Sequence, residues 1–235
     1  MIAIIGRGNV ASHLYTAIKP LKDVCLVNPH SFEGLPESPE LILISVSDDA
    51  ISKVVNNLPL KQFPIAHTSG SVSMDVLRGK SKNYGVFYPL QTFTKGIAMD
   101  YKDIPIFLEA SNETMMIKLK EIASVFSNHI LEADSEARKK LHLASVYACN
   151  FVNALAGIAT ELLKDSKIDQ SVLIPLMEQT VRKLQLVSPQ LAQTGPAVRE
   201  DYKVIKSHLD MLENKPACRD VYSILTELII NSKQV

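Results

Sequence analysis

The residues best suited to chemistry form a glycine turn directly behind the apolar run Met1–Ile5. In this turn, Gly6 permits a sharp bend, Gly8 leaves the backbone without a Cβ, and Ala11 allows close packing of helix on strand. The N–H groups of the helical turn that follows face an anion such as a pyrophosphate. We therefore predict a dinucleotide site, against the alternative of a glycine turn that binds nothing. The residues expected to bind the cofactor in this turn are Gly6, Arg7, Gly8, Asn9 and Val10.

Further cofactor contacts are expected where other predicted strands end. Asn28 follows the predicted strand 24–27, at the position where NAD-preferring sites carry an acidic residue. The missing carboxylate favours NADP, with NAD as the alternative cofactor, although Asn28 could equally form a turn before Pro29. Asp48 and Asp49 are predicted to be helix N-caps rather than catalytic acids. The other residues expected to meet the dinucleotide are Ser45, Val46, Ser47 and Ser69.

Two histidines are candidates for moving a proton, which imidazole does near neutral pH. His67 ends the predicted strand 64–67, and His142 lies on an apolar helix. Asn150 or Asn153 on the same helix is expected to orient a substrate, and Arg199 to hold a carboxylate through two hydrogen bonds. Each has a structural alternative: a hydrogen-bonded core histidine, an amide that meets another side chain, or an arginine paired with a neighbouring carboxylate. No cysteine, histidine or carboxylate cluster has metal-ligand spacing, so no metal is expected.

These residues need a scaffold of alternating strands and helices, which the first 134 residues supply. Short apolar runs predict strands at 2–5, 24–27, 41–46, 64–67, 84–88, 104–108 and 129–132. Amphipathic segments between them predict helices at 10–18, 49–56, 74–77 and 113–127. The nearly continuous apolar run 41–46 is typical of a central parallel strand that is covered on both faces. The alternation therefore predicts an α/β fold with a Rossmann-type doubly wound, mostly parallel sheet.

The chain changes character after Asp134, because residues 135–235 contain no clear strand. We therefore predict two domains, a dinucleotide-binding domain at 1–134 and an all-α helical domain for substrate binding and dimerisation at 135–235. The segment 136–164 is predicted to be one long helix that is apolar nearly all round. Such a helix should be buried on all sides, so we expect it to contact the first domain and a second subunit. Further helices are predicted from Asp169, over 202–212, and from Pro216 to Ser232.

The composition is that of an ordinary globular protein, with 46% hydrophobic and 21% charged residues among 235. Basic and acidic residues balance at 25 each, so charge implies no nucleic-acid or membrane partner. The amino-terminal apolar run is too short for a signal peptide, and no apolar stretch is expected to reach transmembrane length. Three widely separated cysteines in apolar surroundings predict free thiols and a cytoplasmic protein.

The motifs together resemble a bacterial family in which a Rossmann-like domain is joined to the helical domain of unknown function 2520. The resemblance covers the whole chain, and its motifs are Gly6–Val10, Ser47-Asp48, His67–Gly70, Tyr88–Phe93, His142–Asn150 with Asn153, and Thr194–Pro196 with Arg199, Asp201 and His208. The wider relatives of the family are pyrroline-5-carboxylate reductase, ketopantoate reductase, prephenate dehydrogenase and deazaflavin-dependent NADP oxidoreductases. The resemblance implies NADP binding at Gly6–Val10, a substrate cleft between the domains, and a homodimer formed through the carboxyl-terminal helices.

Two functions are consistent with these residues. The first is an NAD(P)-dependent oxidoreductase that transfers a hydride between the nicotinamide and a small carbonyl or imine substrate bearing a carboxylate. Ketopantoate and hydroxyacid reductases use a lysine four residues before an asparagine of the long helix. Those positions here hold Val146 and Cys149, so lysine chemistry is not carried over to this chain. The alternative is a dinucleotide-binding regulator or scaffold without turnover.

Overall fold

The structure, a computed structural model, describes residues 1–59 and 61–232. The chain forms two compact units, Met1–Phe151 and Val152–Val235. The boundary between these compact units falls inside the long helix, whereas the two predicted domains meet at residue 134, where that helix begins. The first half of the helix belongs with the sheet because the buried Arg138 on it donates a hydrogen bond to the carbonyl oxygen of Ser69, in the first unit.

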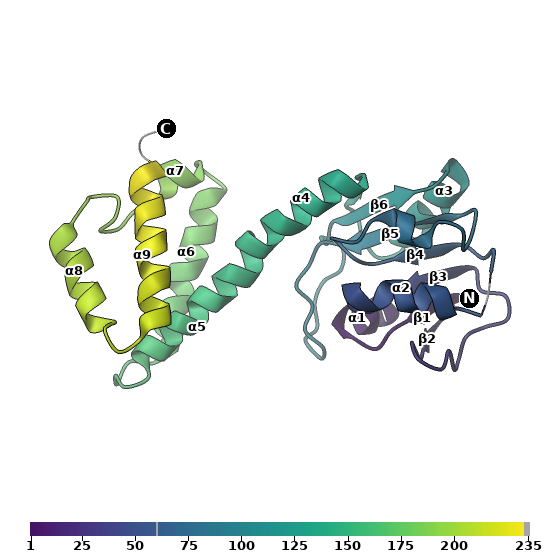
Figure 1. The fold of residues 1–235 in the computed structure, drawn as a ribbon, viewed down its shortest axis with the longest axis horizontal. Helices are drawn as coiled ribbons and strands as arrows, with labels where there is room; N and C mark the ends of the chain where they lie inside the picture. Colours follow the sequence, from purple (N-terminus) through teal and green to yellow (C-terminus); the bar gives the residue numbers. More distant parts are fainter. Residues whose placement is uncertain (60, 233–235) are drawn as a thin grey trace. The chain divides into compact units, whose positions relative to one another are not determined.

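The described residues of the first unit form one seven-stranded sheet in the order β2-β1-β3-β4-β5-β6-β7 (Figure 1). The strands are β1 (Ile2–Ile5), β2 (Val24–Val27), β3 (Leu41–Ile44), β4 (Ile65–His67), β5 (Tyr84–Pro89), β6 (Ile106–Ala110) and β7 (Ile130–Glu132). Neighbouring strands from β2 to β5 pair in parallel, and β5 pairs with β6 in the antiparallel direction. The carboxyl ends of β2, β1, β3, β4 and β5 therefore lie along one edge of the sheet.

Helices cover both faces of this sheet. The helices α1 (Asn9–Ile18) and α3 (Glu113–Ala123) pack on one face, and α2 (Asp48–Asn57) with the 3₁₀ helix η1 (Met74–Leu77) packs on the other. Successive residues of β1 alternate between the two cores, since side chains of a strand point to opposite faces in turn. This arrangement confirms the predicted Rossmann-type, doubly wound and mostly parallel sheet, followed by helices.

A helix of 29 residues, Ser135–Leu163, follows β7. It consists of α4 (Ser135–Ser145), the π-helical segment η2 (Val146–Phe151) and α5 (Val152–Leu163). By length and composition alone this helix could cross a membrane, so the expectation that no apolar stretch reaches such a length is wrong. No residue of its most apolar window is buried within the chain. The contacts expected with the first domain and with a second subunit stay predictions.

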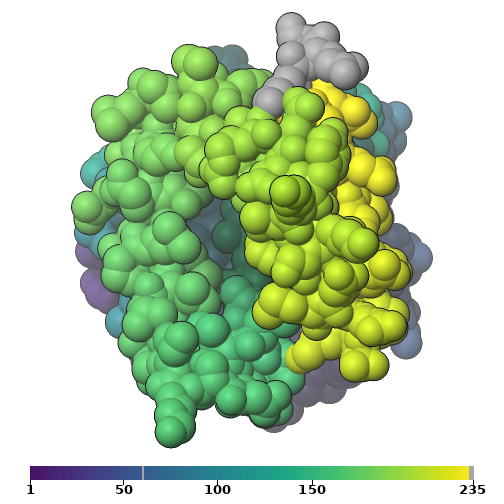
Figure 2. Space-filling model, turned by 90° about the vertical axis from the view of Figure 1, so that its left-hand side faces the viewer, coloured from purple at the N-terminus to yellow at the C-terminus, as the bar shows by residue number. Residues whose placement is uncertain are grey.

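The second unit contains only helices and their connections among its described residues. After α5 come η3 (Gln170–Leu173), α6 (Ile174–Leu184), α7 (Pro189–Ala192), α8 (Tyr202–Met211) and α9 (Pro216–Asn231). Asp169 accepts a hydrogen bond from the Ser171 N–H at the start of η3, and Pro216 lies in the first turn of α9, as predicted. Figure 2 shows the surface of these helices in green to yellow. Large apolar side chains lie on that unit's surface, including Leu186 at 83% and Leu191 at 78% exposure.

Candidate functional site

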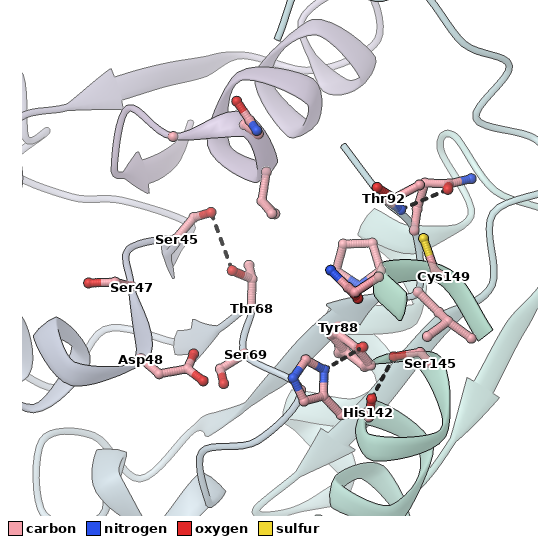
Figure 3. A pocket seen from close by; sticks show the side chains of 18 of the residues that line it. Ser45, Ser47, Asp48, Thr68, Ser69, Tyr88, Thr92, His142, Ser145 and Cys149 are labelled. Carbon is pink, nitrogen blue, oxygen red and sulfur yellow. Dashed lines mark hydrogen bonds between the residues drawn. The ribbon is translucent and has the colours of Figure 1, made fainter. Parts of the chain in front are cut away.

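A pocket of about 730 Å³ lies at the carboxyl edge of the sheet, and its lining comes from the first unit. Carboxyl ends of parallel strands are where open α/β sheets bind ligands. Four segments supply the walls: the turn after β1, the ends of β3 and β4, the end of β5, and the helix around residue 145. The lining residues are Arg7–Val10, Ser45–Asp48, Thr68–Gly70, Tyr88–Thr92, His142, Ser145 and Ala148–Asn150 (Figure 3).

The glycine turn after β1 is shaped to admit a ligand. Gly6 has a φ of +148°, and a Cβ there would lie 2.0 Å from the Ser45 carbonyl oxygen, so only glycine fits. A Cβ on Gly8, in contrast, would meet nothing within 4 Å, which leaves the backbone open to close approach. Helix α1 begins at Asn9 with no side-chain cap, and no acceptor within residues 1–59 and 61–232 binds the N–H groups of its first three residues. These amides are the donors that an anion requires.

The ends of β3 and β4 are tied together on the opposite wall. The Thr68 hydroxyl donates to the Ser45 hydroxyl at 3.3 Å. Asp48 accepts a hydrogen bond from the Ser71 hydroxyl, which connects the start of α2 to the loop after β4. The prediction that Asp48 and Asp49 are N-caps is wrong, because both lie in the first turn of α2 and the preceding residue is the cap. Their charges there are favoured by the helix dipole instead.

Arg138 of α4 fixes the loop after β4. Its side chain is fully buried, and its guanidinium donates to the carbonyl oxygens of Ser69, Gly70 and Val72 at 3.0, 3.1 and 2.8 Å. It also pairs with the Glu109 carboxylate at 2.9 Å. A buried guanidinium is tolerated only when such partners compensate for its lost hydration. The arginine therefore locks two pocket residues, Ser69 and Gly70, in place.

His67 lies beneath the pocket and does not line it. The ring is fully buried, and the Ser69 N–H donates to its Nδ1 at 3.2 Å, which leaves the proton of the neutral ring on Nε2. Burial, reinforced by the charge of Arg138, lowers the pKa of His67 from 6.5 to about 4. The imidazole is therefore neutral at pH 7. We assign it no part in proton transfer.

Tyr88 and His142 form the polar centre of the pocket. The Tyr88 hydroxyl lies 3.1 Å from His142 Nδ1, and the two rings meet edge to face with centroids 6.0 Å apart (Figure 3). Burial raises the pKa of Tyr88, so its hydroxyl keeps its proton at neutral pH. Tyr88 belongs to the motif Tyr88–Phe93, but no catalytic role was predicted for it. The available signal was a phenol at the end of a buried strand, directly before a proline turn.

The long helix reaches the pocket through its π-helical segment. The segment η2 has wider turns than an α-helix, a feature that recurs at functional sites. It supplies Ala148, Cys149 and Asn150 to the lining, six to eight residues beyond His142. The Ser145 hydroxyl donates to the His142 carbonyl oxygen at 2.7 Å, which steadies the helix next to the Tyr88 pair.

The structure brings most of the predicted site residues together. Those that line the pocket are Arg7, Gly8, Asn9, Val10, Ser45, Val46, Ser47, Ser69, His142 and Asn150. The Asn9 side chain donates to the Phe93 carbonyl oxygen at 2.9 Å, so its backbone and not its amide group faces a ligand. Gly6 gives the turn its shape and does not line the pocket.

Three predicted site residues lie elsewhere. Asn28 accepts a hydrogen bond from the His30 N–H at 2.9 Å, which is the turn-forming role given as its alternative. Asn153 and Arg199 belong to the second unit, so their substrate roles stay predictions. Among the described residues no three histidine, cysteine or acidic side chains are grouped to hold a metal ion. The three cysteines carry free, half-buried thiols.

The second half of the chain, from the last two strands of the sheet onward, identifies its family. Residues 104–229 match the family model described as a domain of unknown function (DUF2520). The chain belongs to the DUF2520 family. This membership confirms the resemblance drawn from the motifs. No curated protein matches the chain.

Solved structures share the complete fold with this DUF2520 protein. A provisionally named NADP oxidoreductase from Bacteroides fragilis is 36% identical, with a TM-score of 0.91 over 98% of this chain and 97% of its own. A Thermotoga maritima protein is 21% identical, with a TM-score of 0.71 over 100% of both chains. A reductive aminase from Aspergillus terreus, in complex with NADPH and ethyl-5-oxohexanoate, is 13% identical, with a TM-score of 0.74 over 99% of this chain and 93% of its own. At 21% and 13% identity, the last two structures show a similar fold and nothing about function.

Proposed function

We propose that this DUF2520 protein is an NADP-dependent oxidoreductase. It transfers a hydride between the cofactor nicotinamide and a small carbonyl or imine substrate, which we expect to carry a carboxylate. One observation carries the proposal: the pocket that holds the bare amides of the glycine turn also holds the hydrogen-bonded pair Tyr88 and His142. The 36% identical Bacteroides fragilis relative, provisionally named as an NADP oxidoreductase, supports the same chemistry.

The residues of the pocket fit a dinucleotide. The open Gly8 backbone and the unpaired N–H groups at the start of α1 match a pyrophosphate, because they combine close approach with hydrogen-bond donors and the positive helix end. Arg7 lines the same wall and adds a cation. Ser45, Ser47 and Ser69 offer hydroxyl or backbone partners along the neighbouring strand ends. A bound nicotinamide cofactor supplies the hydride.

The protein's own task in reduction is then to supply a proton. Tyr88 is a proton donor suited to a substrate carbonyl oxygen or imine nitrogen, because burial keeps its hydroxyl protonated at neutral pH. His142 Nδ1, at 3.1 Å, is placed to return a proton to the Tyr88 oxygen after each transfer, while Nε2 of the half-buried ring takes up a proton from solvent so that the imidazole stays neutral. This arrangement uses the tautomer in which Nδ1–H donates to Tyr88, so that the Tyr88 O–H points into the pocket.

A combined binding and turnover experiment tests the proposal. NADPH and NADH binding are measured by calorimetry, and oxidation of the reduced nicotinamide is followed by absorbance with keto acids, ketones plus amines, and cyclic imines. We expect NADPH binding and turnover of at least one carbonyl or imine class. Tight NADPH binding with no turnover across the series would contradict an oxidoreductase and favour the regulatory alternative. The absence of any dinucleotide binding would contradict both.

We also propose that a second copy of the chain covers the helical unit. Within the described part of that unit, only Ala197, Ile205 and Leu212 are buried apolar residues. Leu176, Val181, Leu186, Leu228 and other large apolar side chains are exposed. A unit of this size needs a larger core, and a homodimer provides one by matching the same apolar faces. Light scattering after size exclusion should give a dimer, and Leu176→Glu should weaken it. A wild-type monomer at micromolar concentration would contradict the proposal.

A further inference from the structure

A second hollow adjoins the pocket at the end of β2. It has a volume of about 450 Å³ and shares Val46 and Ser47 with the first pocket, so the two spaces meet at the end of β3. The remaining lining residues are Pro29, His30, Ala50, Lys53, Val54 and Asn57. They come from the turn after β2 and from one side of α2. A ligand laid along the carboxyl edge would pass from one hollow to the other beside Ser47.

The turn after β2 is held by its own hydrogen bonds. Asn28 uses its side-chain oxygen to accept from the His30 N–H at 2.9 Å and its backbone oxygen to accept from the Phe32 N–H at 2.9 Å. Pro29 further restricts the backbone. The exposed His30 therefore stands on a well-ordered turn, and it lines the hollow together with Pro29.

Lys53 of α2 gives this hollow a positive charge. His30 also lines it, and no carboxylate does. Within residues 1–59 and 61–232 no acidic side chain forms an ion pair with Lys53. An ammonium group without a partner binds a phosphate strongly, as a point charge. A ribose with two unmodified hydroxyls would instead be matched by an acidic residue at the end of β2, where this chain has Asn28.

We propose that Lys53 and His30 bind the 2′-phosphate on the adenosine ribose of the dinucleotide and thereby select NADP over NAD. The inference rests on the proposed function, because the same cofactor occupies both hollows. The cation comes from α2, across the hollow from β2, and not from an arginine that follows β2 in the sequence. The Ser47 hydroxyl, on the wall common to both spaces, lies where the adenosine ribose would pass.

Dissociation constants for NADPH and NADH test this assignment in matched variants. Lys53→Met removes the charge and keeps much of the side-chain length. The control is Lys61→Met, because Lys61 is also exposed but precedes β4, at the opposite edge of the sheet. We expect Lys53→Met to weaken NADPH roughly tenfold and to leave NADH unchanged, as the loss of one charge-assisted contact would do. His30→Asn should act in the same direction, and Lys61→Met should change neither constant.

Two further measurements complete the test. The first uses a ligand that lacks the nicotinamide, and the second uses a variant that adds a carboxylate at the end of β2. Adenosine 2′,5′-bisphosphate should bind wild type more tightly than ADP does, and Lys53→Met should remove that difference. Asn28→Asp, which introduces the missing carboxylate, should lower NADPH affinity and spare NADH. If wild type binds both cofactors and Lys53→Met leaves their ratio unchanged, this inference is overturned while the proposed function stands. If wild type binds neither cofactor, both are overturned.

Discussion

Gly70 and His142 are in direct contact: a Cβ built on Gly70 would lie 2.6 Å from Nδ1 of the His142 ring. The same Cβ would lie 2.8 Å from Cζ of Tyr88. The backbone of the loop after β4 therefore packs against the hydrogen bond that joins the two rings. Arg138 holds the carbonyl oxygen of Gly70 at 3.1 Å, so the loop has little freedom to withdraw.

We predict that Gly70→Ala separates Tyr88 from His142. The new methyl group requires one of the rings to move, because the loop is held by the buried Arg138. Turnover should fall at least tenfold, while NADPH affinity changes less than threefold, since the glycine turn after β1 lies on another wall. Steady-state kinetics and calorimetry on the same samples measure both quantities. Unchanged turnover would show that the contact between the rings is not needed.

The two glycines of the first turn should respond differently to alanine. Gly6→Ala places a Cβ against the Ser45 carbonyl oxygen at a φ of +148°, so we expect the backbone strain alone to cost about 1–3 kcal/mol of unfolding free energy. Gly8→Ala meets no protein atom within 4 Å and has an ordinary φ of −75°, so the free energy of unfolding should hardly change. The methyl group that Gly8→Ala adds should nevertheless weaken dinucleotide binding about tenfold or more, because it blocks the close approach of the pyrophosphate to the backbone. Urea unfolding and cofactor titration distinguish the two effects, and full affinity in Gly8→Ala would contradict the assigned site.

We predict that Tyr88→Phe lowers turnover about 10²- to 10⁴-fold, the usual contribution of a general acid. His142→Gln should have a smaller effect, because it acts by returning a proton to Tyr88 and does not touch the substrate in this scheme. NADPH affinity should stay close to that of wild type in both variants. The matched control is Tyr84→Phe at the other end of β5, which should leave turnover unchanged. Equal turnover in Tyr88→Phe and wild type would remove Tyr88 from the mechanism.

The buried His67 should make the fold sensitive to acid. Its pKa is lowered to about 4 in the folded state, so between pH 6.5 and 4 the unfolded chain takes up a proton that the folded chain does not. Stability conferred by the neutral ring is present above pH 6.5 and falls as the pH decreases, by about 3 kcal/mol near pH 4. Urea unfolding of wild type and His67→Gln across this range measures the contribution. An equal pH dependence in both proteins would contradict it, and His129→Gln, at an exposed histidine, is the control.

The sheet and its glycine turn were predictable because their signals are local. The apolar runs of β1 and β3 and the turn between β1 and α1 specify buried parallel strands without reference to distant residues. The reversal between β5 and β6 was not predictable, since both directions bury the same side chains of an apolar strand. The π-helical turns of η2 were also missed, because hydrophobic periodicity does not distinguish a short wide segment from the α-helix around it.

The site was predicted less completely than the fold, since its contacts join distant segments. Arg138 stands among charged residues of α4 and looks like part of a solvated helix face, yet it is fully buried against the loop after β4. Tyr88 acquires its partner only when α4 returns to the end of β5. Lys53 meets the turn after β2 across a hollow that no spacing in the sequence indicates. Long-range packing, not local pattern, creates each of these contacts.

The change of strand direction at β6 sets how many strand carboxyl ends lie side by side along this edge. Five strands, from β2 to β5 in sheet order, end on the same side, and four spacings between them span roughly 19 Å. Beyond β5 the neighbouring strand presents its amino end, so an extended molecule finds no further strand terminus. The two ends of such a molecule also meet different chemistry, a cationic hollow at β2 and a phenol at β5. For the proposed dinucleotide these two ends favour one orientation, with the adenosine at β2 and the nicotinamide at β5.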